Sequence, residues 1–314
     1  MATFLVTGGG GFIGSNLVRA LLDRGDTVRV LDNFATGRPE NLAGLESKIT
    51  LFKKSIVDPA ACVEAMTGCD YVLHQAALPS VPRSVEAPVE SNLVNVDGTL
   101  NVLEAARKTG VKRLVFAASS SAYGETPVLP KVETMVPDPL SPYAASKLAG
   151  ESYLKVYYKC YGLETVALRY FNVFGPRQDP KSQYAAVIPR FATAALKGEP
   201  ATVFGDGQQT RDFCFIENCI EANLLATTAK DAPGKVFNVA CGERTSLLET
   251  IDLLADIVGK KVAPKHEPGR AGDVKDSLAD ITQAKKILGY TGKVSFRQGL
   301  EKTVEWFRAG LGKA

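Results

Sequence analysis

The feature that most constrains this chain is a cluster of glycines between a short apolar segment and a helical pattern. Thr3–Thr7 is apolar enough for a buried strand, and the helical pattern begins at Phe12. The glycines that matter are spaced three apart: Gly8, Gly11 and Gly14. Glycine permits a tight turn, lets backbone amides approach a pyrophosphate, and lets the helix pack closely on the strand. Because the helix N-terminus adds partial positive charge there, the segment predicts a dinucleotide-binding turn.

A carboxylate after the second strand-like segment refines this expectation. Asp32, followed by Asn33, comes directly after Thr27–Leu31. A carboxylate in that place can accept hydrogen bonds from ribose hydroxyls and repels a 2′-phosphate. We therefore expect NAD in preference to NADP, and Arg38 is the nearby residue that keeps NADP open. Consecutive glycines alone also suit a flexible turn, so the interpretation depends on the strand, the helix and the carboxylate together.

Strand-like and helix-like segments alternate through the first half of the chain. The strand-like segments are short and rich in Val, Leu and Phe, which is typical of strands buried on both faces of a parallel sheet. They are Thr3–Thr7, Thr27–Leu31, Ile49–Lys53, Tyr71–Gln75, Arg113–Ala118 and Thr165–Tyr170. Helix-length segments between them include Phe12–Arg24, Val89–Thr109 and Tyr143–Tyr161. This alternation predicts an α/β fold with a doubly wound parallel sheet.

The pattern becomes less regular after about residue 172, where prolines interrupt it. We expect an NAD-binding domain at residues 1–172 and a smaller substrate-binding lobe at residues 173–314, with some segments of the lobe returning to the first domain. The amphipathic segment Phe296–Ala309 is interpreted as a packing helix.

A tyrosine and a lysine with helical spacing form the second chemical signal. Tyr143 and Lys147 are four residues apart, so they share one face of the predicted helix. We expect the lysine to lower the pKa of the phenol from ~10, which would let Tyr143 take a proton from a hydroxyl. Ser119 follows a strand-like segment, at the sheet edge where ligands bind. The tyrosine–lysine spacing is common on helices, so the hypothesis depends on all these features together.

Composition excludes several other classes. The net charge is +3, and Lys and Arg form no dense run, so we expect no nucleic-acid binding. The six cysteines form no C-x-x-C pair and the chain has two histidines, which predicts reduced thiols and no metal site. No apolar run approaches the ~20 residues that cross a bilayer, and the chain enters a strand at its start. We therefore expect a cytoplasmic protein with no signal peptide and no membrane segment.

Taken together, these residues resemble the extended short-chain dehydrogenase/reductase family. Within it, the chain is similar to the UDP-hexose 4-epimerases, particularly the bacterial ones acting on UDP-N-acetylglucosamine. The resemblance covers essentially the whole chain and rests on His74–Ala77, Ser80–Ser84, Ser119–Gly124, Leu140–Tyr143, Arg169–Gly175, Thr210–Phe213 and Arg270–Asp273. It implies a Rossmann sheet, NAD as cofactor, a UDP-sugar as substrate, and a homodimer formed through a four-helix bundle.

The resemblance also implies a role for individual positions. Ser119 matches the serine that hydrogen-bonds the reacting hydroxyl, Tyr143 matches the base, and Lys147 matches the residue that tunes it and binds the nicotinamide ribose. The positions implied for the NAD site are Gly8, Gly11, Phe12, Ile13, Gly14, Asp32, Asn33, Ile56, Ala76, Asn95, Tyr143, Lys147 and Tyr170. Those implied for the UDP-sugar site are Ser80, Arg83, Ser120, Ser121, Asn172, Val187, Val203, Phe204, Arg211, Arg270, Asp273 and Ser277.

Four positions qualify the resemblance. Ser55 stands where the family often has an acidic residue beside adenine, and Asp58 is a candidate substitute. Ser120 and Ser121 stand where related dehydratases carry Asp-Glu, and related decarboxylases usually have Glu at the second position. Simple epimerisation needs neither acid. Ser277 matches the position where a tyrosine restricts the family to plain hexoses, so we expect it to admit an N-acetyl group.

The resemblance thus implies NAD-dependent epimerisation at carbon 4 of UDP-N-acetylglucosamine and UDP-N-acetylgalactosamine, with UDP-glucose and UDP-galactose as further candidates, through a 4-keto intermediate. A UDP-glucuronate 4-epimerase, or another NAD-dependent enzyme of nucleotide sugars, is the alternative. A non-catalytic NAD-binding protein is a third reading, disfavoured because the serine, tyrosine and lysine are all present.

Overall fold

The architecture centres on a seven-stranded sheet in which every pair of neighbours is parallel. The computed structural model describes residues 1–180, 187–269 and 275–311. Across the sheet the strands are β11 (Lys235–Val239), β6 (Glu164–Tyr170), β5 (Arg113–Ser119), β4 (Tyr71–His74), β1 (Thr3–Thr7), β2 (Thr27–Leu31) and β3 (Ile49–Phe52). The order reverses beside β1, as in doubly wound sheets. The predicted fold class is confirmed.

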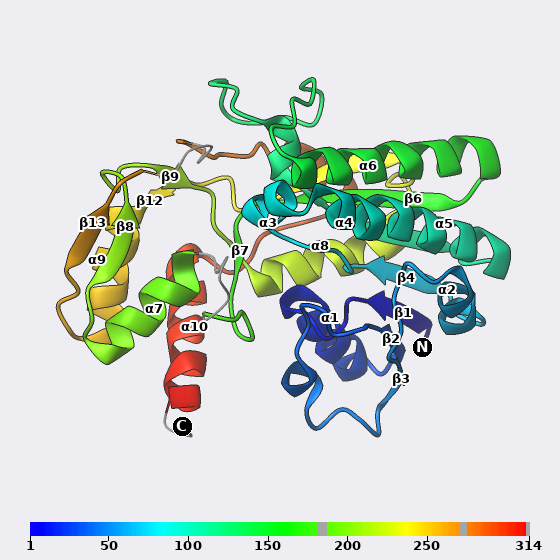
Figure 1. The fold of residues 1–314 in the computed structure, drawn as a ribbon, viewed down its shortest axis with the longest axis horizontal. Helices are drawn as coiled ribbons and strands as arrows, with labels where there is room; N and C mark the ends of the chain where they lie inside the picture. The colour runs from blue at the N-terminus through cyan, green and yellow to red at the C-terminus, as the bar shows by residue number, and fades with distance from the viewer. Residues whose placement is uncertain (181–186, 270–274, 312–314) are drawn as a thin grey trace.

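Helices cover both faces of the sheet (Figure 1). On one face lie α2 (Pro59–Met66), α5 (Gly98–Thr109) and α6 (Pro142–Tyr161), and on the other lie α1 (Phe12–Asp23) and α8 (Ile216–Thr228). Each face has its own core of apolar side chains, because strands of a parallel sheet are buried on both sides. Because both faces of the sheet are covered, ligands can reach it at the carboxyl ends of the strands.

Six of the seven central strands match the strand-like segments of the sequence to within a residue at each end. The seventh, β11, was not identified, because it lies in the irregular second half. It pairs in parallel with β6, with Lys235 opposite Val166 and Val239 opposite Tyr170. A segment from the second half of the chain therefore forms the edge strand of the sheet. The division at residue 172 itself stays a prediction.

One predicted helix contains an irregularity. The segment 89–109 is helical, but it consists of α4 (Pro88–Asn92), a π-helical turn at Leu93–Asp97, and α5. π-helical turns are frequent at functional sites. The short helix α3 (Val81–Glu86) precedes them, and a single turn at Ser120–Tyr123 follows β5.

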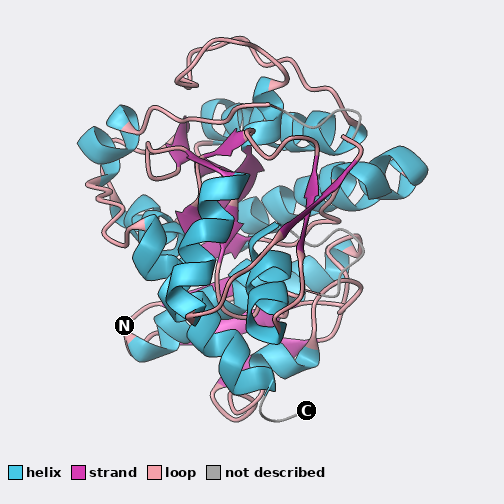
Figure 2. Cartoon of the chain, turned by 90° about the vertical axis from the view of Figure 1, so that its left-hand side faces the viewer, coloured by secondary structure: helices cyan, strands magenta, loops and turns pink. Residues whose placement is uncertain are grey.

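Parts of the second half of the chain form a smaller lobe beside the sheet (Figures 1 and 2). The parallel pair β8 (Ala201–Phe204) and β13 (Pro264–Glu267) packs with α7 (Val187–Lys197), α9 (Leu247–Val258) and α10 (Phe296–Leu311). Two further strand pairs join β7 (Val173–Phe174) to β10 (Cys214–Phe215) and β9 (Thr210–Arg211) to β12 (Thr245–Ser246). A second π-helical turn spans Ala284–Leu288. In the described parts of the chain, no helix combines the length and apolar character needed to cross a membrane.

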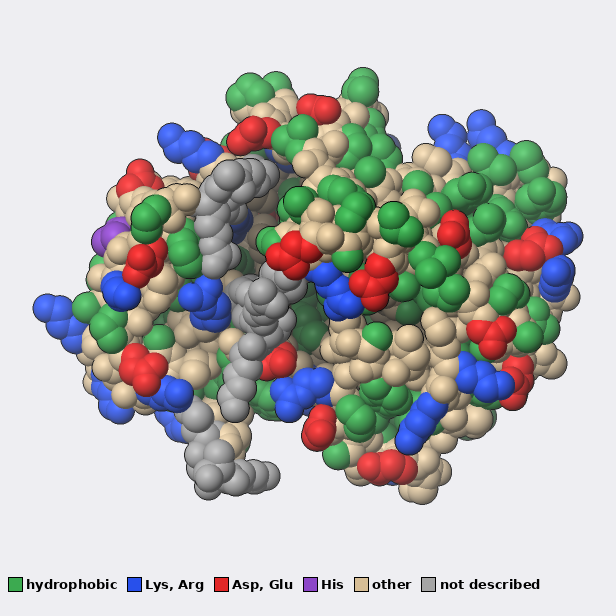
Figure 3. Space-filling model, viewed as in Figure 1, with side chains coloured by type: hydrophobic (Ala, Val, Ile, Leu, Met, Phe, Trp, Pro, Cys, Tyr) green, Lys and Arg blue, Asp and Glu red, His purple; other side chains and the backbone are tan. Residues whose placement is uncertain are grey.

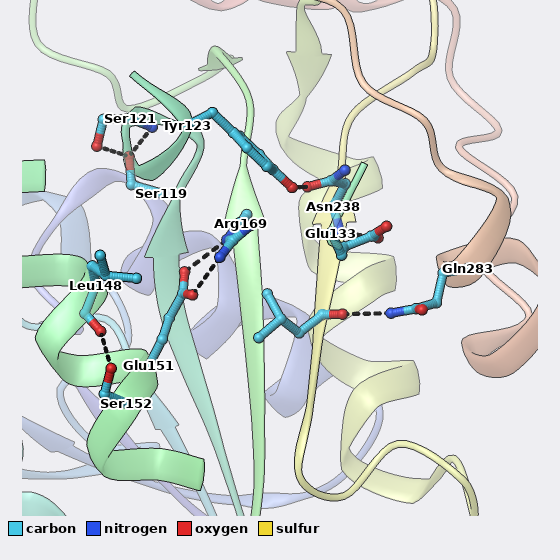
Figure 4. A network of polar contacts seen from close by, with 11 residues as sticks. Ser119, Ser121, Tyr123, Glu133, Leu148, Glu151, Ser152, Arg169, Asn238 and Gln283 are labelled. Atoms are coloured by element: carbon cyan, nitrogen blue, oxygen red, sulfur yellow. Dashed lines mark hydrogen bonds and ion pairs between the residues drawn. The ribbon is translucent and has the colours of Figure 1, made fainter. Parts of the chain in front are cut away.

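A buried ion pair ties α6 to the sheet (Figure 4). Arg169 on β6 donates from Nε to Oε1 of Glu151 at 2.9 Å and from Nη2 to Oε2 at 2.7 Å. Both side chains are about 95% removed from solvent. The guanidinium also lies 4.6 Å from the ring centroid of Tyr123. Because Glu151 is one helical turn after Lys147, this pair fixes the helix that carries Tyr143 and Lys147.

We expect the Glu151→Gln substitution to lower the free energy of unfolding by about 3–5 kcal/mol, because it leaves the Arg169 charge buried without its anion. Glu301→Gln is the matched control. Its partner Arg297 lies 3.2 Å away and both side chains are about half exposed, so the loss should be far smaller than that of Glu151→Gln. Urea denaturation measures both, and equal losses would contradict a structural role for the buried pair.

Candidate functional site

The glycine turn after β1 leaves no room for side chains. Gly8 has φ +69°, and a Cβ there would lie 2.7 Å from the amide nitrogen of Ala76. A Cβ at Gly14 would lie 2.1 Å from the carbonyl oxygen of Gly8. The amide of Gly11 donates to that same oxygen at 3.1 Å. The turn therefore brings its backbone close to the N-terminus of α1, as an approaching phosphate requires.

Asp32 shapes this turn as well as facing the cavity. Its Oδ2 accepts from the amide of Gly10 and its Oδ1 accepts from the amide of Phe34, both at 2.7 Å. Burial raises the pKa of the carboxyl and the two amide hydrogen bonds oppose that shift. Each carboxylate oxygen can still accept a second bond, so Asp32 remains able to receive a ribose hydroxyl. The sequence did not reveal that Gly10 is needed for this contact.

The turn and Asp32 form one wall of a cavity of about 610 Å³ at the carboxyl edge of the sheet. This volume is typical of small-molecule sites. Of the positions implied for NAD, those lining the cavity are Gly8, Gly11, Phe12, Ile13, Gly14, Asp32, Asn33, Ile56, Ala76, Tyr143, Lys147 and Tyr170. Ser80 and Arg83, implied for the sugar, line it too. Figure 3 shows that the surface is hollowed in the middle of this face.

Asn95 is the implied NAD position that does not line the cavity. It lies in the π-helical turn with 2% of its surface exposed. Its Oδ1 accepts from the amide of Leu78 at 2.7 Å, and its Nδ2 donates to the Leu78 carbonyl and to Oγ of Ser146, both at 3.1 Å. The side chain thus fastens the loop after β4 to the helix carrying Tyr143.

The proposed catalytic side chains meet where β5 ends and α6 begins. The Tyr143 phenol lies close enough to Ser119 for that hydroxyl to lower the pKa of the phenol. The hydroxyl of Ser121 donates to Oγ of Ser119 at 2.8 Å, which leaves Ser119 oriented by two neighbours (Figure 4). The amide of Tyr143 donates to Oγ of Ser84 at 3.0 Å, so α3 positions the first turn of α6. The expected juxtaposition of serine, tyrosine and lysine is present.

The electrostatics of this cluster differ from the expectation. Nζ of Lys147 donates to the carbonyl of Ala117 at 2.8 Å and lies 6.0 Å from the ring centroid of Tyr143. Burial lowers the pKa of Lys147 to about 8. Burial raises the pKa of Tyr143, and the neighbouring Ser119 hydroxyl opposes the shift only in part. In the protein alone, Lys147 therefore does not make the phenol acidic, because its ammonium is held by a backbone carbonyl.

A histidine beside the cluster is held uncharged. His74 at the end of β4 is fully buried, and its ring nitrogens contact Oγ1 of Thr7 at 2.7 Å and Oγ1 of Thr99 at 3.1 Å. Burial and the charge of Lys147 lower its pKa to about 3. His74 therefore joins β1, β4 and α5 as a neutral hydrogen-bonding group.

A second cavity, of about 220 Å³, lies in the smaller lobe. Four of the positions implied for the UDP-sugar line it: Asn172, Val187, Phe204 and Arg211. Val203 is fully buried on β8 behind it. Ser277 lines neither cavity, but its Oγ accepts from Nδ2 of Asn172 at 3.4 Å. Arg270 and Asp273 lie outside the described residues.

Ser120 and Ser121 lie in the turn directly after Ser119, and neither lines either cavity. The suggestion that Asp58 replaces the missing adenine acid is wrong in this structure. Its Oδ1 accepts from the amides of Ala60 and Ala61, at 2.9 and 3.3 Å, which makes it the N-cap of α2. Ser55 does line the larger cavity.

Several cavity residues were not identified from the sequence. In the smaller cavity they are Arg190, Phe191, Gln209, Phe213 and Leu247, and in the larger one they include Asn41, Gln75, Arg177, Gln178 and Asp179. Most lie on loops or helices of the second half, where no periodic pattern distinguishes them. Of these residues, Arg177 could have been noticed in the sequence, because a cationic side chain in a Gly175-Pro176-Arg177 turn is a candidate for binding an anion.

Together the glycine turn, the carboxylate after β2 and the serine–tyrosine–lysine cluster define a short-chain dehydrogenase/reductase with a dinucleotide site. The chain belongs to the NAD dependent epimerase/dehydratase family, whose pattern it matches over residues 4–240. It is 41% identical over 313 residues to a UDP-glucose 4-epimerase of Mycolicibacterium smegmatis, a match that covers 97% of this chain and 98% of that protein.

Two solved structures share the fold closely. A UDP-N-acetylglucosamine 4-epimerase from Methanobrevibacter ruminantium, in complex with UDP-N-acetylmuramic acid, has a TM-score of 0.93 and 40% identity, covering 98% of this chain and 99% of that one. A Thermus thermophilus UDP-glucose 4-epimerase complex with NAD has a TM-score of 0.89 and 41% identity over the same shares. NAD is the cofactor of this family, and the glycine turn, where a Cβ at Gly8 or Gly14 would collide with backbone, fits its diphosphate.

The buried lysine generates a pH-dependent prediction for the protein freed of NAD. The pKa of Lys147 is about 8 in the folded protein against 10.5 for an ordinary lysine, so the unfolded chain binds more protons between these values. The free energy of unfolding should therefore rise with pH from 8 to 10, by up to about 3 kcal/mol relative to Lys147→Met. Urea denaturation of both proteins across this range tests it, and parallel pH profiles would contradict a desolvated ammonium.

Proposed function

We propose that this chain interconverts the carbon-4 epimers of a UDP-hexose with bound NAD, and that UDP-N-acetylglucosamine and UDP-N-acetylgalactosamine are its preferred pair. UDP-glucose and UDP-galactose are further substrates in this proposal. The observation that carries it is the Tyr143 phenol, which lies beside Ser119 and in the wall of the cavity that the glycine turn also lines. A proton acceptor and a dinucleotide site thus share one enclosure.

In this proposal Tyr143 takes the proton of the 4-hydroxyl at its phenolic oxygen, while Ser119 orients that hydroxyl. NAD supplies reversible two-electron oxidation of the sugar carbon. Lys147 adds a positive charge that favours the phenolate once a ligand draws its ammonium from the carbonyl of Ala117. After the 4-keto sugar has turned to present its opposite face, Tyr143 returns the proton. The cofactor ends as it began.

The turning step requires an anchor far from the reacting carbon. We propose that residues 173–314 supply it and residues 1–172 hold NAD. Phe204 in the smaller cavity offers a flat apolar surface to uracil, and Arg211 and Asn172 offer donors to the diphosphate. Nη1 of Arg211 already donates to the carbonyls of Thr210 and Lys275, at 2.9 and 3.1 Å, which fixes the side chain. Remote binding energy can then support chemistry on a loosely held hexose.

Two serines favour epimerisation over elimination or decarboxylation. Ser121 donates to Ser119, and neither it nor Ser120 can act as a carboxylic acid toward a leaving group. UDP-glucuronate 4-epimerisation stays the second candidate, since the same Ser/Tyr/Lys set would serve it.

We also propose a cytoplasmic homodimer. Apolar side chains are exposed on α3, α4, the π-helical turn and α6, among them Val85, Val89, Leu93, Val156 and Tyr161. Two such faces can form the four-helix bundle that the family implies. The six cysteines are all free, as a reducing compartment favours.

Product analysis with the Tyr143→Phe variant tests the function. We expect the wild type to convert UDP-N-acetylglucosamine to its carbon-4 epimer with no net NADH, measured by chromatography, mass spectrometry and absorbance. Tyr143→Phe should lose about 10²–10⁴-fold in rate, because general-base assistance is removed. Net NADH production would indicate a dehydrogenase, and near-normal epimerisation by the variant would remove Tyr143 from its role.

The choice of hexose is tested at Ser277. Its side chain contacts Asn172 beside the smaller cavity, so a bulky replacement should occupy the space for a 2-acetamido group. We expect Ser277→Tyr to lower kcat/KM for UDP-N-acetylglucosamine by about 10–200-fold while leaving UDP-glucose within about threefold. Ser277→Ala is the control and should retain both. Unchanged turnover of the N-acetylated sugar by Ser277→Tyr would contradict the assignment.

A further inference from the structure

An arginine from the second half of the chain lines the larger cavity. Arg177 follows β7 in the Gly175-Pro176-Arg177 turn, yet it shares the cavity wall with the glycine turn. Its Nη2 donates to Oδ1 of Asn16 on α1. Nδ2 of Asn16 in turn donates to the carbonyls of Phe12, at 2.8 Å, and Pro176, at 3.2 Å. The side chain is therefore fastened to the first turns of the helix whose N-terminus faces the cavity.

The charge of Arg177 lacks an anion among the described residues. No carboxylate within 4 Å of its guanidinium is found there, and Nε is shielded from solvent without a hydrogen-bond partner. Burial and the neighbouring Arg19 lower its pKa to about 10, so it stays a cation at neutral pH in surroundings that disfavour a cation. A partly buried, unpaired charge is costly unless a ligand supplies the opposite charge.

The backbone at this position is also constrained. Arg177 has φ +72°, a left-handed backbone conformation that is strained for a non-glycine residue. Two residues later, Asp179 lies 3.6 Å from Nη1 of Arg38, which comes from the loop after Asp32. The segment 176–179 is thus attached to α1 at one end and to the loop after β2 at the other. These attachments hold it along the edge of the larger cavity.

We propose that Arg177 binds the diphosphate of NAD, opposite the backbone amides of the glycine turn. The diphosphate is the anionic part of this cofactor, and the glycine turn already places it at the N-terminus of α1. A guanidinium has five donors, of which one N–H of Arg177 is used by Asn16. The smaller cavity, which would hold UDP, does not include Arg177. The inference rests on NAD as cofactor and is independent of which sugar is turned over.

The direct test measures how fast bound NAD leaves the holoenzyme. Protein as purified is mixed with excess isotopically labelled NAD, and the exchange is followed by mass spectrometry of the protein-bound pool. We expect Arg177→Gln to exchange NAD about 10–100-fold faster than the wild type, because a hydrogen bond between charged groups is lost. Arg19→Gln is the matched control. It removes the same charge nearby from a side chain outside the cavity wall, and exchange should change less than threefold.

Other results would overturn the proposal. Exchange at the wild-type rate in Arg177→Gln, or equal acceleration in Arg19→Gln, would show that Arg177 makes no direct contact with the cofactor. If Arg177→Gln exchanges NAD at the wild-type rate but has a raised KM for the UDP-sugar, Arg177 binds the diphosphate of the substrate instead of that of NAD. Loss of epimerase activity with faster NAD exchange supports the proposal, whereas absence of epimerisation in the wild type would refute the proposed function alone.

A second measurement needs no variant. Phenylglyoxal modifies accessible arginines, and peptide mass spectrometry locates them. In wild-type protein freed of NAD, we expect added NAD and ADP-ribose to protect Arg177 at least fivefold, and nicotinamide riboside, which lacks the diphosphate, to give no protection. Equal labelling of Arg177 with and without ADP-ribose would overturn the proposal even if Arg177→Gln fails to fold.

Discussion

The rest of the site depends on one constraint, which is that the central strands are parallel and end at the same edge. The carboxyl ends of β1, β2, β4, β5 and β6 therefore place the glycine turn, Asp32, Ala76, Ala118 and Tyr170 around one cavity, and Ser119 follows Ala118 directly. Because these strands are buried on both faces, the edge is rigid. Helix α6 is then held against it by the ion pair between Glu151 and Arg169, so that Tyr143 meets Ser119.

Burial also changes the pKa values of several ionisable side chains around the site. Lys147 and Arg177 are cations in surroundings that lower their pKa values, and His74 is kept neutral between two threonines. Burial also raises the pKa of the Tyr143 phenol. The protein alone thus concentrates positive charge around a site whose ligands are anions, and it leaves the acidity of the phenol to be tuned when those ligands bind.

The sequence predicted the strands well because buried parallel strands form short apolar runs bounded by helices, as at Thr27–Leu31. It also predicted the glycine turn, since only glycine fits Gly8 and Gly14. Contacts between distant segments could not be predicted in this way. The sequence around β11 and β6 gives no sign that the two strands pair. Likewise, no local pattern indicates that Arg177 contacts Asn16. Asp58 was misjudged because a capping aspartate and a ligand-binding one look alike in sequence.

The central claim is that the Tyr143 phenol faces the reacting carbohydrate hydroxyl inside the NAD-binding enclosure. A crystal structure of the full chain with NAD and UDP-N-acetylglucosamine tests it most directly. The account predicts that Oη of Tyr143 and Oγ of Ser119 both lie within hydrogen-bonding distance of the hexose 4-hydroxyl, about 2.6–3.2 Å. A phenol pointing away from both the hexose and the nicotinamide would contradict it.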